Sequence, residues 1–164
     1  MSVRIDKIYV DMDGVIANFE KRYTERYGHI SEKVRRTVFR ENFADFIATE
    51  QFVTLDLMPD ARQLITALDK IDITKEILSS TAYQEVYETI SMQKARWLAT
   101  HNITWKQNFV PGKAHKYKWA TPNSIIIDDT LSVINDWEKA GGIAIRHKNA
   151  FDTLEELEFI LQYT

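Results

Sequence analysis

Two aspartates with a glycine directly behind them are the residues of this chain whose types and spacing best allow chemistry. Asp11 and Asp13 end the apolar run of residues 8–10, and Gly14 follows them. In an extended chain, residues two apart point to the same side, and near a protein surface unit charges ~4 Å apart repel by roughly 4 kcal/mol. A divalent cation or a shared proton must therefore sit between the carboxylates, and Gly14 lets a ligand approach the backbone. The pattern indicates phosphoryl transfer; the alternative is a polar turn that ends a buried strand.

Polar clusters also follow two later apolar runs. Residues 79–81 (Ser-Ser-Thr) come after one of them, and the acidic pair at 128–129 comes after the other. Each cluster alone is equally consistent with a helix cap or a turn. In open α/β sheets, however, ligands bind beyond the carboxyl ends of the strands, so three clusters at one sheet edge predict one site. We expect one lysine to reach that site from the group Lys113, Lys116 and Lys118.

Hydrolysis of a phosphate monoester needs more than a nucleophile. A carboxylate can attack phosphorus to form an aspartyl-phosphate, Mg²⁺ can bridge carboxylate and phosphate oxygens, and a lysine and a serine can hold the remaining oxygens. The chain contains no cysteine, so thiolate ligands and disulfides are excluded, and an all-oxygen site suits Mg²⁺. The histidines lack the paired spacing of a zinc site, and we expect them at the surface or in helix caps: His29, His101, His115 and His147.

The elements that must position these residues alternate along the chain. Apolar runs predict strands over residues 5–10, 73–78, 108–110, 124–127 and 142–145. Apolar residues three and four apart predict helices over residues 16–27, 61–68, 84–101 and 131–140. Ser31 can cap a further helix, Asp152 or Thr153 can cap the last one, and the aromatic stretch of residues 39–52 indicates a small helical insertion. The alternation predicts an α/β fold with an open parallel sheet covered on both faces.

Length and charge narrow the class of protein. A chain of 164 residues fits one domain. The formal net charge is −3 with no large basic block, which argues against a long nucleic acid as partner and favours a small anionic substrate. Apolar runs fall short of the ~20 residues that a membrane span needs, and the first residues lack the apolar segment of a signal peptide. We therefore expect a cytoplasmic protein that does not bind membranes.

Taken in order, the DxD motif, the strand-end serines, the lysine and the acidic pair resemble the phosphatases of the haloacid dehalogenase (HAD) superfamily. Residues 11–20 (DMDGVIANFE), with residues 78–81 and 125–129, look specifically like the 5'(3')-deoxyribonucleotidase family. The resemblance implies a Rossmann-like three-layer sandwich in which the first strand is central and the second and fourth flank it. It also implies one domain over residues 1–164, with a core of about 1–14 and 73–164 and a small helical cap of about 15–72.

The same resemblance implies a division of labour among the acidic residues. Asp11 would be the nucleophile and a metal ligand. Asp13 would be the general acid/base, with its main-chain carbonyl on Mg²⁺. The third metal ligand would come from Asp128 or Asp129, and Asp129 is preferred because relatives with a Gly-Asp pair bind metal through the second position.

Other matching positions concern the phosphate and the substrate. Ser79 matches the phosphate-holding hydroxyl, with Ser80 as the alternative because the run offers two registers. Lys116 matches the phosphate-binding lysine because it begins a Lys-x-x-aromatic-small pattern. Lys118 is the alternative, because an alignment to the family that counts back from the acidic pair without a gap selects it. Phe19 matches a position that contacts the nucleobase in the nucleotidases; alternatively it is a core residue.

The expected substrate is a small phosphorylated molecule, in the first instance a nucleoside monophosphate hydrolysed through an aspartyl-phosphate. A sugar phosphate and a polynucleotide end are the alternatives within the same chemistry. A phospho-accepting signalling receiver carries its acidic pair on the first strand and its acceptor in mid-chain, which is the reverse of the order here. A nucleotide-binding protein without catalysis is disfavoured because both acids of the DxD motif are intact. The preference for 5' or 3' esters and the formation of a homodimer stay open.

Overall fold

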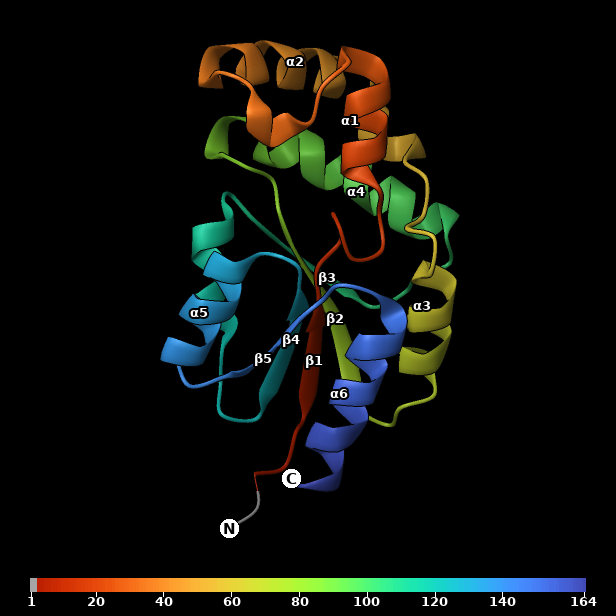
Figure 1. Ribbon diagram of the computed structural model, residues 1–164, viewed down its shortest axis with the longest axis vertical. Coiled ribbons are helices and arrows are strands. Elements are labelled where there is room, and N and C mark those ends of the chain that lie inside the picture. The colour runs from red at the N-terminus through yellow and green to blue at the C-terminus, as the bar shows by residue number, and fades with distance from the viewer. Residues whose placement is uncertain (1–2) are drawn as a thin grey trace.

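Five parallel strands form the centre of the molecule, and β1 (Lys7–Val10) is the middle one (Figure 1). The computed structural model describes residues 3–164. The sheet order is β3-β2-β1-β4-β5, and the other strands span Thr74–Ser80 (β2), Lys106–Val110 (β3), Ser124–Asp128 (β4) and Ile143–Arg146 (β5). Val10 pairs with Ile77 on one side and Ile127 on the other, so the residues that follow these three strands meet at one edge. The predicted parallel sheet and its central first strand are confirmed.

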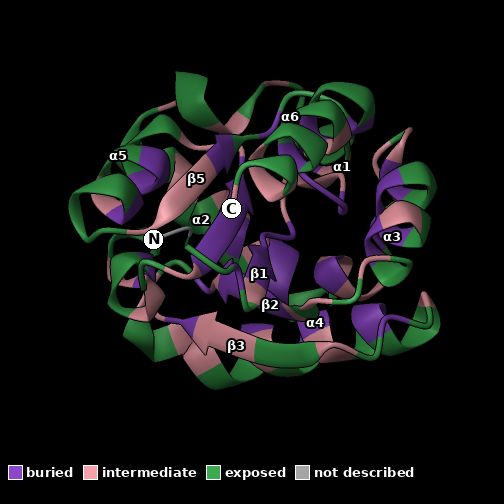
Figure 2. Cartoon of the chain, turned by 90° about the horizontal axis from the view of Figure 1, so that it is seen from below, coloured by how far each residue is buried: buried purple, intermediate pink, exposed green. Residues whose placement is uncertain are grey.

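Alternate residues of the strands contribute to two hydrophobic cores, one on each face of the sheet. Ile8 and Val10 belong to the core that includes α3 (Ala61–Asp69) and α6 (Ala150–Gln162). Tyr9, between them, faces the opposite core, where its ring meets Trp137 of α5 (Leu131–Lys139) edge-on at a centroid distance of 5.4 Å. The inner strands β1, β2 and β4 are accordingly largely buried between two layers of helices, whereas the edge strands β3 and β5 are more exposed (Figure 2). The fold is a three-layer α/β sandwich of the Rossmann-like type, as predicted.

Two helices that follow β1 lie beyond the carboxyl ends of the strands (Figure 1). They are α1 (Phe19–Tyr27) and α2 (Arg36–Ala48), and with the 3₁₀ turn Gln51–Thr54 we call them the helical cap. The cap rests on α4 (Tyr87–Thr100), where Gln93 Nε2 donates to the carbonyl of Ile47 at 2.9 Å. Helix α3 falls within the predicted cap of about residues 15–72 but packs beside α6.

The first helices begin later than predicted. Residues 12–17 form a tight loop, and Asn18 then caps α1 by accepting a hydrogen bond from the backbone N–H of Lys21 at 3.4 Å. Ser31 does not cap an α-helix; it opens the short 3₁₀ turn Ser31–Lys33 and donates its hydroxyl to the carboxylate of Glu20. Helix α2 begins only at Arg36.

The last helix begins earlier than predicted. Its cap is Asn149, whose side-chain oxygen accepts from the backbone N–H of Asp152 at 2.8 Å, so the assignment of Asp152 or Thr153 as the cap is wrong. Thr153 instead places its hydroxyl 2.7 Å from Nδ1 of His147. Within residues 3–164, no helix has the length and apolar character needed to cross a bilayer.

Candidate active site

The loop after β1 turns back on itself and presents two aspartates at the carboxyl edge of the sheet. The backbone N–H of Asp11 still bonds to the carbonyl of Ile127 on β4, at 3.0 Å. The carbonyl of Met12 then accepts the N–H groups of residues 15, 16 and 17 at 2.9–3.1 Å, which closes the loop. Gly14 has a φ of +83°, a conformation that L side chains rarely adopt. The sheet and this tight loop therefore fix Asp11 and Asp13 at the carboxyl edge of the sheet.

Gly14 also makes room for an acidic neighbour. A Cβ atom at this position would overlap the carboxylate of Asp129, which follows β4. The glycine therefore serves two needs at once, the left-handed turn and the close approach of Asp129.

Three carboxylates gather at this edge of the sheet. Asp11, Asp128 and Asp129 each offer an oxygen, and the three oxygens lie within 4.8 Å of one another. Burial, and then the charge of Asp11, raises the pKa of Asp128 to about 6 and that of Asp129 to about 7. A cluster of hard oxygen donors that repel one another is the donor set that fits Mg²⁺. The side chain of Asp13 is not part of this cluster, so a metal role for Asp13 would have to come from its main chain.

Lys116 is the lysine that reaches the acidic cluster. It lies on the 3₁₀ segment Lys113–Trp119, and its Nζ donates to Oδ1 of Asp11 at 2.9 Å and to Oδ2 of Asp128 at 2.7 Å. Burial alone would lower the pKa of Lys116, but the two carboxylates raise it well above its usual value. Lys118, the sequence alternative, is exposed and lies with its Nζ 3.0 Å from His115 instead.

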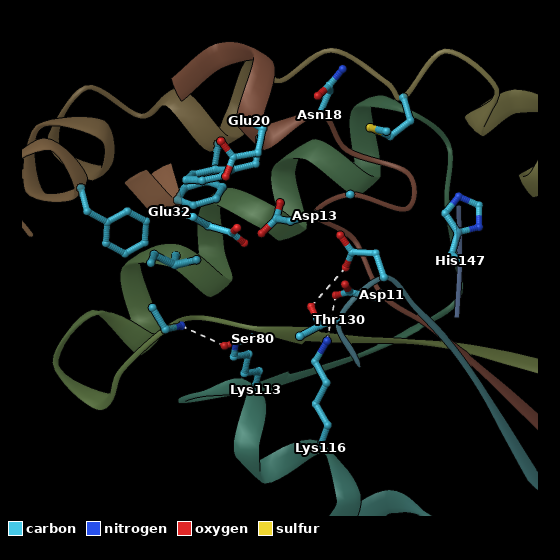
Figure 3. Close-up of a pocket in the computed structure, with 18 of the residues that line it drawn as sticks. Asp11, Asp13, Asn18, Glu20, Glu32, Ser80, Lys113, Lys116, Thr130 and His147 are labelled. Atoms are coloured by element: carbon cyan, nitrogen blue, oxygen red, sulfur yellow. Dashed lines mark hydrogen bonds and ion pairs between the residues drawn. The ribbon is translucent and has the colours of Figure 1, made fainter. Parts of the chain in front are cut away.

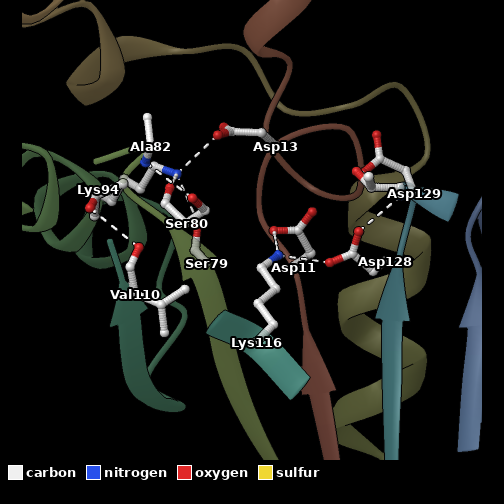
Figure 4. Close-up of polar contacts among 12 residues, drawn as sticks. Asp11, Asp13, Ser79, Ser80, Ala82, Lys94, Val110, Lys116, Asp128 and Asp129 are labelled. Atoms are coloured by element: carbon white, nitrogen blue, oxygen red, sulfur yellow. Dashed lines mark hydrogen bonds and ion pairs between the residues drawn. The ribbon is translucent and has the colours of Figure 1, made fainter. Parts of the chain in front are cut away.

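Lys94 of α4 is a site residue that the sequence reasoning missed. Its Nζ donates to Oδ2 of Asp13 at 2.9 Å, to Oγ of Ser79 at 2.8 Å and to the carbonyl of Ser80 at 2.8 Å (Figure 4). Burial raises the pKa of the Asp13 carboxyl, and the Lys94 ammonium opposes part of that rise. A signal was present in the sequence, because Lys94 lies four residues after Ile90 and three before Trp97, on the apolar face of its helix.

The two candidate serines have different surroundings. Ser79 is 1% exposed, and its hydroxyl accepts the hydrogen bond from Lys94. Ser80 lines the cavity, and its hydroxyl accepts from the backbone N–H of Ala82 at 3.0 Å. Ser79 and Ser80 are successive residues of β2, so their side chains point to opposite sides, and it is Ser80 that lines the cavity. This placement favours Ser80 as the phosphate-holding hydroxyl, whereas the sequence favoured Ser79.

A cavity of about 740 Å³ lies between the acidic edge and the helical cap (Figure 3). Asp11, Asp13, Ser80, Lys116 and Asp129 lie on its sheet side. Apolar side chains of the cap, of the chain after it and of α4 form the opposite wall: Phe19, Phe39, Phe43, Phe52, Met58 and Ile90.

Phe19 combines the two roles that the sequence left open. It lines the cavity, and its ring stacks on Phe52 with an interplanar angle of 16° and a centroid distance of 5.7 Å. Its ring also lies 5.0 Å from that of Phe46, a fully buried residue of the cap. Phe19 therefore joins the aromatic core of the cap to the cavity surface.

One histidine also borders the cavity. His147 is 4% exposed, which contradicts the expectation that it lies at the surface. Its backbone N–H donates to the carbonyl of Asp128 at 2.8 Å, and burial lowers its pKa. His147 lies here because it directly follows Arg146, the last residue of β5, which pairs with Asp128 of β4.

Comparisons with known proteins reveal structural likeness without recognisable sequence likeness. No protein-family model matches the sequence, and no curated protein matches it. A hydrolase from Streptococcus pneumoniae TIGR4 is similar in structure, with 13% identity, a TM-score of 0.56, and coverage of 94% of this chain and 99% of the other. A predicted phosphatase from Clostridium acetobutylicum has 10% identity and a TM-score of 0.56, with 93% and 90% covered. A phosphonoacetaldehyde hydrolase-like protein from Oleispira antarctica has 13% identity and a TM-score of 0.53, with 99% and 84% covered.

At these identities the likeness shows a common fold. It is the Rossmann-like α/β sandwich with a five-stranded parallel sheet described above. The match extends over nearly all of this chain, so the helical cap and the sheet belong to the compared region.

Proposed function

We propose that the protein is a Mg²⁺-dependent phosphomonoesterase that hydrolyses nucleoside monophosphates through an aspartyl-phosphate. One observation carries the proposal: Asp11 lies at the carboxyl end of the central strand, bonded to Lys116 and within 4.8 Å of two further carboxylates, on the wall of a cavity. A nucleophilic carboxylate, a buried cation and a metal-binding acidic pair are what phosphoryl transfer through an aspartyl-phosphate requires.

The first step forms the bond between Asp11 and phosphorus. A carboxylate oxygen of Asp11 attacks, the bond from phosphorus to the leaving oxygen breaks, and Asp13 delivers a proton to that oxygen. Lys116 orients the Asp11 carboxylate, because its Nζ lies 2.9 Å from Oδ1. In the second step Asp13 takes a proton from water, the water oxygen attacks phosphorus, and inorganic phosphate leaves while Asp11 is regenerated.

Asp11, Asp129 and Asp128 would hold the Mg²⁺. When bound, the ion neutralises charge on the phosphate oxygens and on the crowded carboxylates. Ser80, which lines the cavity, is the serine we assign to a phosphate oxygen.

The aromatic wall supports a nucleoside as the leaving group. Phe19, Phe43 and Phe52 line the cavity opposite the acidic edge, and aromatic faces stack favourably on planar bases. A sugar phosphate is the second candidate, because Glu20 and Glu32 also line the cavity and carboxylates accept hydrogen bonds from hydroxyl groups.

The test is a Mg²⁺-dependent phosphate-release screen over deoxyribonucleoside and ribonucleoside monophosphates and sugar phosphates. We expect turnover that requires Mg²⁺, favours nucleoside monophosphates and is lost in Asp11→Asn. Asp6→Asn is the matched control, because Asp6 is an exposed residue before β1. A preference for sugar phosphates would be consistent with the proposed mechanism but would contradict the nucleotidase assignment. Activity that survives in Asp11→Asn would contradict the assignment of Asp11 as the nucleophile.

A further inference from the structure

All three N–H donors of the Lys94 ammonium group are hydrogen-bonded to other groups of the protein. The side chain is 2% exposed, and its three N–H donors bond to the Asp13 carboxylate, the Ser79 hydroxyl and the Ser80 carbonyl. Its Nζ also lies 5.3 Å from the centre of the Phe52 ring. No donor is left over for a phosphate oxygen, so Lys94 does not serve as a second phosphate-binding cation in this arrangement.

A gain in folding stability does not explain why a lysine is buried at position 94. Desolvating a lysine is costly, and a buried ion pair is often no more stabilising than apolar side chains of similar volume. The neighbouring Ile90 and Trp97 show that apolar residues fit on this face of α4. The reason for a lysine must lie in what its ammonium contacts.

The contact that matters is with Asp13. Lys94 occupies Oδ2 at 2.9 Å, while Oδ1 is buried and has no hydrogen-bond partner within the part of the chain that the structure describes. Asp13 lines the cavity beside Asp11 (Figures 3 and 4). The ion pair therefore fixes the orientation of the Asp13 carboxylate and leaves one of its oxygens without a partner.

We propose that Lys94 is a positioning residue for the reaction, which holds the Asp13 carboxyl at the cavity wall in the orientation from which it protonates the leaving-group oxygen of the substrate. The inference rests on the proposed function. As the phosphorus–oxygen bond breaks, a proton on the Asp13 carboxyl moves to the leaving oxygen, and Asp13 becomes a carboxylate paired with Lys94. A leaving group that is stable as an anion does not need this proton, so the contribution of Lys94 depends on the leaving group.

The experiment compares the single-turnover rates at which Lys94→Met and the wild type form the aspartyl-phosphate from two phosphoesters, because only this first step depends on the leaving group. One is the best nucleoside monophosphate from the screen, and the other is p-nitrophenyl phosphate, whose leaving group departs without a proton. We expect the rate of aspartyl-phosphate formation from the nucleoside monophosphate to fall about 100-fold, the lower range for a general acid, with the half-saturating concentration within about 3-fold because Lys94 has no donor left for the phosphate. On p-nitrophenyl phosphate we expect a fall of less than about 5-fold. Equal losses on both substrates would overturn the inference.

Gln93→Met is the matched control on the same helix. Gln93 is buried like Lys94, but it bonds to the carbonyl of Ile47 in the helical cap and touches no site carboxylate. It should lower stability without changing the ratio of the two activities. A change in that ratio as large as the one in Lys94→Met would assign the effect to disturbed packing of α4 and overturn the inference.

A double variant tests whether Lys94 acts through Asp13. Lys94→Met combined with Asp13→Asn should be as active as Asp13→Asn alone, within about 2-fold, because the carboxylate that Lys94 positions is already absent. It also removes both members of the buried ion pair, so it tests the inference even where Lys94→Met alone does not fold. A further loss beyond that of Asp13→Asn would overturn the inference.

The two proposals fail in different ways. A wild-type protein that hydrolyses no phosphoester would overturn the proposed function and the inference with it. An active wild type whose Lys94→Met variant forms the aspartyl-phosphate equally slowly from both substrates would overturn only the role of Lys94.

Discussion

The carboxylate of Asp129 occupies the space that a side chain on Gly14 would need. The two residues come from the ends of neighbouring strands, and their contact joins the DxD loop to the acidic pair. Gly14 is therefore constrained in two ways, by the nearby Asp129 carboxylate and by its positive φ. A glycine that has a positive φ but no close neighbour can separate the two effects.

Gly14→Ala should lower the affinity for Mg²⁺, whereas its loss of stability should be the same as that of a control glycine variant. The added methyl group displaces Asp129, so we expect Mg²⁺ affinity to fall about 10-fold or more, as it does when the surroundings of a metal ligand are disturbed. Gly28→Ala is the control, because Gly28 has a similar φ of +79° and nothing within 4 Å of the added atom. Both variants should lose roughly 1–2 kcal/mol of stability from backbone strain. Calorimetric Mg²⁺ titrations that show equal affinities would contradict this relationship.

Lys116→Met should be strongly destabilising in the absence of metal. The substitution leaves Asp11 and Asp128 buried together without their shared cation. We expect the free energy of unfolding at pH 7 in EDTA to fall by roughly 3–5 kcal/mol, the usual cost of breaking a buried pair. Lys118→Met removes an exposed lysine of the same segment and should change it by less than about 0.5 kcal/mol. Urea unfolding curves that superimpose for the two variants would count against the buried pairing.

The contribution of Asp128 and Asp129 to stability without metal should decrease as the pH rises from about 4 to about 7. The pKa of Asp128 is raised to about 6 and that of Asp129 to about 7, whereas the ordinary value is 3.8. In this window these two carboxyl groups bind more protons in the folded protein than in the unfolded chain, so their contribution to stability falls as the pH rises. The measurement is the difference in unfolding free energy between the wild type and Asp129→Asn across this range, in EDTA. We expect the wild type to lose stability relative to the variant, and Mg²⁺ to restore it at pH 7; a difference that does not change with pH would contradict the crowding of these carboxylates.

Phe19→Leu should weaken the binding of nucleotides more than that of sugar phosphates. Stacking of a base on an aromatic ring contributes roughly 1–3 kcal/mol, so we expect KM for a nucleoside monophosphate to rise about 5-fold or more. KM for a sugar phosphate should change by less than about 2-fold. Phe46→Leu is the control, because Phe46 contacts Phe19 but is fully buried away from the cavity lining. Equal changes in KM for both substrate classes would remove Phe19 from substrate recognition.

The sheet was accessible to sequence reasoning because its signal is local. The run Ser124–Asp128 is apolar enough to be buried on both faces, and the alternation of such runs with helical periodicity predicts a parallel sheet. The edge at which the three polar clusters meet follows from that sheet alone. The order of strands around β1 came from the resemblance to a known family, and it is confirmed.

Other details depend on packing that no local pattern shows. The burial of Lys94 requires the end of β2, α4 and the loop after β1 to come together. The choice between Ser79 and Ser80 depends on where β2 ends, because side chains alternate along a strand and one residue decides which serine lines the cavity. The cap of α6 was misplaced because Asn149, Asp152 and Thr153 are all good capping residues, and only the direction of the chain after β5 selects the first.

The most direct test of the central claim is to trap the covalent intermediate. Wild-type protein with Mg²⁺ and a phosphate-labelled nucleoside monophosphate is quenched in acid within milliseconds, digested, and mapped for labelled peptides. We predict label on the peptide that contains Asp11, removable by hydroxylamine as an acyl phosphate is, and absent in Asp11→Asn. Turnover without label at Asp11, or label on another residue, would contradict the account.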